Sequence, residues 1–210
     1  MRETLGPIHY WLYHKIQLQE QLIEELLRWG NEKRAEVIEL RIESHKLYGK
    51  PAEGKLETCV QGKDIHRWLQ EKLDSVEYRL AYIFTLLLDD KYITMEETQA
   101  IFRENGLNTA KSMHICKAQD KPMDARELYK RIYDCLLEGM PCDDVNEIIV
   151  STVDEVVWKR TKCIHEKYWK QVGGDIIYFY VFRQAWVEGF LQDSGMKYEE
   201  LQRHIYAIKK

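Results

Sequence analysis

Apolar residues recur every three or four positions along most of this chain, and this spacing limits the folds that it can adopt. The stretch 7–29 shows it best, because one helical face would carry Ile8, Leu12, Ile16, Ile23 and Leu26. Such a stripe is typical of an amphipathic helix that packs against a core. Convincing alternation with a period of two is missing, and no Asn-Gly or Asp-Gly pair stands between two alternating runs. We therefore predict an all-α protein.

Glycines, prolines and capping residues divide the chain into about eight helices. Asp64, and the pair of Thr94 and Glu97, have the spacing of helix caps. We expect one compact helical bundle that forms a single domain over residues 1–210. The expected helices cover residues 7–29, 31–47, 65–88, a stretch that ends at Gly106, a stretch that starts at Asn108, 122–138, 175–194 and 198–208, and a long amphipathic stretch covers 142–172.

One phrase occurs twice in the first half of the chain. IHYWLYHKIQLQE occupies residues 8–20, and IHRWLQEKLDSVE occupies residues 65–77. We predict an internal duplication with repeated helical units 1–57 and 58–114, followed by a C-terminal helical part, 122–210. The alternative is that the two helices merely share a packing role. The identical pairs are Ile8/Ile65, His9/His66, Trp11/Trp68, Leu12/Leu69, Lys15/Lys72 and Glu20/Glu77.

The repeated His and Glu residues suggest a metal site, because helical bundles bind metal ions through inward histidine and carboxylate side chains. The eleven residues from His9 to Glu20 advance a helix by about 16 Å, so these two cannot share one ion within their own helix. If the two helices pack antiparallel about a pseudo-twofold axis, His9 lies near Glu77 and His66 near Glu20. With His165 as a third inward histidine, the predicted metal ligands are His9, Glu20, His66, Glu77 and His165, and the expected ion is Fe, Zn or Mn.

Two observations favour a structural role for these residues instead. The Glu-x-x-His motif that di-iron carboxylate bundles use is missing from both helices. His9 and His66 also fall in the first turn of a helix, where the helix dipole disfavours an imidazolium ion. A neutral ring there can pack beside tryptophan and hydrogen-bond to a neighbouring group.

The cysteines give a second, weaker zinc hypothesis. His114, Cys116, Cys163 and His165 have the residue types of a zinc site, but residues two apart on a helix face opposite ways. The chain has five cysteines and no Cys-x-x-Cys pair, which argues against a disulfide framework and favours a reducing compartment. We therefore expect a cytoplasmic protein.

Charge and hydropathy exclude two further classes of function. The formal net charge is −4, whereas a nucleic-acid-binding face needs a basic excess. The most hydrophobic stretch, 175–192, is short and contains Asp175, Arg183 and Glu188, so no membrane span is expected. No catalytic motif is present, and enzyme activity stays open. Two hypotheses are left: a bundle that binds a metal ion or small ligand, and a non-catalytic protein-interaction module that binds a protein partner or forms a homodimer.

Overall fold

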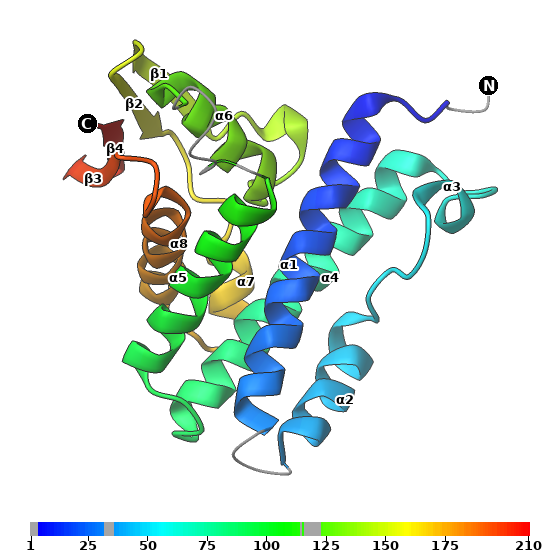
Figure 1. Ribbon diagram of the computed structural model, residues 1–210. Helices are drawn as coiled ribbons and strands as arrows, with labels where there is room; N and C mark the ends of the chain where they lie inside the picture. The colour runs from blue at the N-terminus through cyan, green and yellow to red at the C-terminus, as the bar shows by residue number, and fades with distance from the viewer. Residues whose placement is uncertain (1–3, 32–35, 114, 116–122) are drawn as a thin grey trace. The chain divides into compact units, whose positions relative to one another are not determined.

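The computed structural model describes residues 4–31, 36–113, 115 and 123–210 (Figure 1). Most of these residues lie in helices, as expected, but the C-terminal part also forms an antiparallel sheet, so the all-α prediction is wrong in part. The elements are α1 (Pro7–Asn31), α2 (Glu36–Tyr48), α3 (Leu56–Cys59), α4 (Ile65–Asp89), α5 (Met95–Ser112), α6 (Ala125–Cys135), the 3-10 turn η1 (Pro141–Asp143), β1 (Asn146–Ser151), β2 (Glu155–Arg160), α7 (Glu166–Gln171), α8 (Ile176–Leu191), β3 (Lys197–Gln202) and β4 (Ile205–Lys209).

The chain divides into two compact units, and each unit draws on separated parts of the sequence. Unit 1 comprises Met1–Thr94, Cys135–Asp143 and His165–Ile176, and unit 2 comprises Met95–Asp134, Asp144–Ile164 and Ile177–Lys210. The single domain over 1–210 and the repeated units 1–57 and 58–114 stay predictions. Within the described residues, no helix combines the length and the apolar character that a membrane span requires.

The two helices of unit 1 that carry the repeated phrase, α1 and α4, run side by side in the same direction (Figure 1). His9 contacts His66 near the start of both helices, and Glu20 contacts Arg79 about three turns later. The antiparallel packing that we expected is therefore wrong. The reason is α2, which returns the chain before α4 begins and so lets α4 run parallel to α1.

The core of unit 1 confirms the helical stripe of α1. Leu12, Ile16, Ile23 and Leu26 are at most 1% exposed, whereas Ile8 is 47% exposed and lies outside the core. The predicted cap of α4 is also confirmed, because the Asp64 carboxylate accepts a hydrogen bond from the Arg67 N–H group over 2.9 Å. Periodicity and capping thus place these two helices correctly.

In unit 2, α5 and α8 cross at two glycines. A Cβ atom added to Gly106 would lie 2.1 Å from the Trp186 carbonyl oxygen, and one added to Gly189 would lie 2.0 Å from the Arg103 carbonyl oxygen. Side chains at these positions would push the backbones apart, so only glycine allows the helices to approach so closely. The predicted helix end at Gly106 is wrong, because α5 continues through this residue.

The sheet of unit 2 has the strand order β1-β2-β4-β3, and all neighbouring strands are antiparallel. The β1–β2 hairpin closes where the Thr152 N–H donates to the Glu155 carbonyl over 2.8 Å, and the Thr152 hydroxyl accepts from the Glu155 N–H over 3.0 Å. The β3–β4 hairpin closes at His204, whose φ is 66°. The helical character expected for the amphipathic stretch 142–172 is wrong in large part, and the helix expected over 198–208 is wrong, because strands occupy these residues. Neither turn uses glycine, so neither hairpin has a strong signal in the sequence. The short helix α7 is the one helical segment of the structure within 146–172.

Candidate functional site

The five predicted metal ligands all lie in unit 1 but do not converge on one site. The structure distributes them over three places: His9 with His66, Glu20 with Arg79, and Glu77 with His165. Among the residues that the structure describes, no group of three or more His, Cys, Asp or Glu side chains is placed to hold a metal ion. Residues His114 and Cys116 of the weaker zinc hypothesis lie outside the described residues.

His9 and His66 form a contact at the surface. Their Nε2 atoms lie 3.5 Å apart, and the rings meet edge to face. The Gly6 N–H donates to His9 Nδ1 over 2.9 Å, so a neutral His9 carries its proton on Nε2 and donates towards His66. A metal ion could bind His9 Nε2 only if the proton moved from Nε2 to Nδ1. The protonated Nδ1 could then no longer accept the hydrogen bond from the Gly6 N–H. The tautomer therefore favours the structural role of this pair.

Glu20 and Arg79 form a buried ion pair between α1 and α4. Glu20 is 8% exposed and Arg79 is 1% exposed, and the guanidinium of Arg79 donates to the Glu20 carboxylate. Burial raises the pKa of Glu20 above its ordinary value, although the Arg79 charge opposes that shift. Since Arg79 already occupies the carboxylate, the pair fixes the register of the two helices.

Glu77, Glu138 and His165 form a second buried cluster, which we call the His165 cluster. His165 Nδ1 lies 3.1 Å from a Glu77 oxygen, and His165 Nε2 lies 3.9 Å from a Glu138 oxygen. Burial lowers the pKa of His165, but the two carboxylates outweigh burial, so that the net shift is upward. The two carboxylates thus stabilise the imidazolium form of His165 relative to the neutral ring.

The His165 cluster joins three segments of unit 1 that are distant in sequence. Glu77 belongs to α4, Glu138 follows α6, and His165 immediately precedes α7. The three residues are 1%, 5% and 1% exposed, so the cluster is buried. We interpret the cluster as a structural contact that holds these three segments of unit 1 together. The sequence analysis missed Glu138, whose one signal is a charge inside the apolar run CLLEGM.

Unit 2 contains a groove between α6 and the edge strand β1, with a volume of about 390 Å³. The first residue of α6 lies next to the β1–β2 turn, because the Ala125 N–H donates to the Val153 carbonyl over 3.0 Å. Tyr133, in the last turn of α6, and Asp144, just before β1, line the other end. The helix therefore follows the whole length of β1. The groove is lined by Arg126, Tyr129, Lys130, Tyr133, Asp144, Val145, Asn146, Ile148, Ser151 and Val156.

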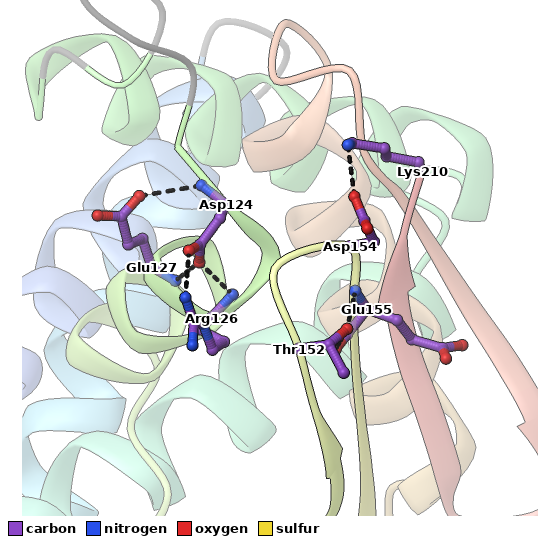
Figure 2. Close-up of polar contacts among 7 residues, drawn as sticks. All are labelled: Asp124, Arg126, Glu127, Thr152, Asp154, Glu155 and Lys210. Atoms are coloured by element: carbon purple, nitrogen blue, oxygen red, sulfur yellow. Dashed lines mark hydrogen bonds and ion pairs between the residues drawn. The ribbon is translucent and has the colours of Figure 1, made fainter.

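Two sets of polar contacts stabilise the turn end of the groove (Figure 2). Asp124 caps α6, since its carboxylate accepts the N–H groups of Arg126 and Glu127 over 2.9 and 3.0 Å. The Glu127 carboxylate accepts the Asp124 N–H in return, which completes a capping box. The Arg126 side chain binds the same carboxylate and is the main cause that lowers the pKa of Asp124 to about 2. In the facing turn, Lys210 pairs with Asp154.

The floor of the groove is aromatic. The Tyr129 ring lies 5.0 Å from the Trp158 ring and 6.4 Å from the Tyr133 ring. Trp158 stands opposite Ile148 in the β1–β2 register, so both side chains lie on the same face of the sheet. Apolar side chains of a ligand would find aromatic contacts there.

The two edges of the sheet differ in character. β3 carries Lys197, Glu199 and Glu200, and charges on an edge strand oppose pairing with another chain. β1 instead exposes Ile148 and Ile149, which are 51% and 53% exposed. The register shifts between Ile148 and Val150, so Ile149 sits in a β-bulge. β1 is thus the apolar edge of the sheet.

Part of the backbone of β1 points away from the sheet. Val145 and Thr152 form backbone hydrogen bonds with the β2 side of the hairpin. Because hydrogen-bonded and non-hydrogen-bonded pairs alternate along an antiparallel ladder, the N–H and C=O groups of Asn146 and Ile148 face outward. Beyond the bulge those of Ser151 do the same. Asn146 and Ile148 have the two-residue spacing that a further strand would need, whereas the bulge places the next outward residue, Ser151, three positions on.

The sequence analysis missed this groove. Its signal was present as the β-branched run IIVSTVDEVV, which is typical of strands.

Comparisons of the chain with protein-family models, with curated proteins and with solved structures found no match.

Proposed function

We propose that the protein is a protein-interaction module, and that the groove between α6 and β1 binds an extended segment of another protein. The segment would add a strand to the sheet next to β1, a recurring mode of peptide recognition. This proposal takes up the interaction hypothesis of the sequence analysis and gives it a binding surface. Metal binding through His9, Glu20, His66, Glu77 and His165 stays a prediction that the separation of these residues does not favour.

The observation that carries the proposal is the apolar edge of β1 beside a preformed groove. An exposed, apolar edge strand invites pairing, and proteins normally protect such an edge. The charged edge of β3 in the same sheet illustrates that protection. At β1, the outward backbone groups of Asn146 and Ile148 supply hydrogen bonds, and the groove supplies pockets for alternate side chains of the ligand.

A phage library of random peptides, long enough to cover β1, tests the proposal on the full chain. We expect selected peptides to lose about tenfold or more in affinity for Ile148→Pro, since proline removes an outward N–H donor that a paired strand would use. Proline is tolerated on an edge strand where the N–H faces solvent. Ile148→Thr is the matched control, because it keeps the N–H group and the β-branched shape and should weaken binding less.

A second measurement uses the unaltered protein and therefore does not depend on the folding of the proline variant. Selected peptides that are N-methylated at alternate residues present fewer backbone donors to an unaltered protein. Methylation on the residues that face β1 should abolish binding, and methylation on the intervening residues should not. The proposal fails if no peptide is selected above background, or if both methylation patterns bind alike.

A further inference from the structure

The groove carries more positive charge than the protein as a whole. The chain has a formal net charge of −4, yet the wall that α6 contributes to the groove bears the cations Arg126 and Lys130. The one acidic residue of the lining, Asp144, lies at the opposite end, beside Tyr133. Among the residues that line the groove, the cations thus lie along the first half of α6 and the acidic residue lies at the far end.

Both cations are available to a ligand. Lys130 is exposed and forms no hydrogen bond or ion pair with the part of the chain that the structure describes. Arg126 donates one hydrogen bond to Asp124 over 2.8 Å, and a guanidinium has five N–H donors. The remaining N–H groups of Arg126 can therefore bind a ligand while the contact with Asp124 is kept.

We infer that the ligand segment is acidic, with an aspartate or glutamate side chain that faces Arg126 and Lys130. This inference rests on the proposed function and specifies its partner. The two cations stand four residues apart on one face of α6, about 6 Å along the helix axis. Alternate residues of a strand are about 6.8 Å apart, so one acidic side chain, or two separated by one residue, matches them.

Antiparallel pairing with β1 would set the direction of the segment, and Asp144 bears on how the segment ends. An added strand antiparallel to β1 would begin at the turn end, near Arg126, and run towards Asn146. Its acidic residue would come first, and the residue two positions later would face the ring of Tyr133. A free C-terminal carboxylate at that end would be repelled by Asp144, so we expect an internal segment of the pattern acidic-x-apolar.

The peptide library separates this inference from the proposed function. We expect the selected peptides to be enriched in the acidic-x-apolar pattern and to bind Lys130→Glu about tenfold more weakly, because the substitution replaces an attraction by a repulsion. Affinity should also fall as salt is raised, because screening acts on exposed pairs. Lys130→Gln is the matched control, with a smaller loss, and selection on Lys130→Glu should favour basic peptides.

Each other outcome overturns one of the two claims. Peptides that require the backbone of β1 but show no acidic preference, and that bind Lys130→Glu unchanged, would overturn the inference and leave the interaction function intact. A concentration-dependent dimer that Ile148→Pro abolishes, measured by light scattering, would make a second copy the occupant and also overturn the inference. Failure to select any peptide that depends on β1 would overturn both claims.

Discussion

Replacement of His165 by glutamine should cost unit 1 several kcal/mol, because it leaves two buried carboxylates without their common cation. At an effective dielectric constant of about 20, charges 3.1 and 3.9 Å apart attract by about 5 and about 4 kcal/mol. Desolvation of Glu77, Glu138 and His165 cancels much of that gross attraction. Measured losses on breaking a buried pair are about 3–5 kcal/mol, and we expect His165→Gln to fall in that range.

The loss should depend on pH in a direction that the structure fixes. The pKa of His165 is raised above its ordinary value of 6.5, so the folded protein holds the proton more tightly than the unfolded chain. The stabilisation by His165 is therefore complete below about pH 6.5 and is lost as pH rises through the folded-state pKa. The free energy of unfolding should fall by at most about 1.4 kcal/mol per pH unit in that window.

Urea denaturation at several pH values above and below 6.5 measures both effects on the full chain. His14→Gln is the matched control, because His14 is an exposed histidine of the same unit and its replacement should change stability by no more than about 0.5 kcal/mol. The reasoning is refuted if His165→Gln is no less stable than His14→Gln. It is also refuted if the pH profiles of His165→Gln and the wild type run parallel above pH 6.5.

Two further predictions concern the helix crossing of unit 2 and the metal hypothesis. In thermal denaturation, Gly106→Ala should destabilise the protein by about 1–3 kcal/mol through overpacking, despite a gain of about 1 kcal/mol in helix propensity. The control is Asn108→Ala at an exposed position of α5, which should be neutral or stabilising. If the metal hypothesis is right, elemental analysis of untagged protein should find stoichiometric Fe, Zn or Mn, and the double variant His9→Ala/His66→Ala should lose it. Metal-free protein with an intact fold would refute that hypothesis.

Sequence reasoning placed the helices of unit 1 well because their signals are local. The apolar stripe of α1 and the Asp64 cap of α4 depend on residues within a few turns of one another. The direction in which the two helices pack is not local. It depends on α2, whose apolar residues Ile38 and Ile42 lie exposed and blur its amphipathic pattern.

The wrong predictions in unit 2 involve residue types that occur in more than one kind of local structure. Gly106 ends a helix in many sequences, but here it allows α8 to approach α5. The hairpins of the sheet close at Thr152 and His204, which are weaker turn signals than Asn-Gly. The groove lies beside the β1–β2 hairpin, so it could not be predicted once β1 had been taken for a helix.

The parallel packing of α1 and α4 explains how identical residues of the repeated phrase acquire different roles. Equal residues at equal heights meet across such a pair, as His9 and His66 do. The two helices differ two residues beyond the glutamates, where α4 carries Arg79 and the corresponding position of α1, 57 residues earlier, is Leu22. Glu20 therefore finds a cation on the neighbouring helix, and Glu77 does not.

A buried glutamate without a cation is costly, so Glu77 needs a partner from outside the helix pair. His165 supplies it, and with His165 come the segments Cys135–Asp143 and His165–Ile176 that unit 1 draws from the second half of the chain. The ion pair with Arg79 and the contact with His165 are thus two different ways in which equivalent glutamates of the two helices gain a cationic partner. The losses in unfolding free energy on substitution of Arg79 and of His165 should accordingly be nearly additive. The reason is that Arg79 pairs with Glu20, whereas His165 contacts Glu77.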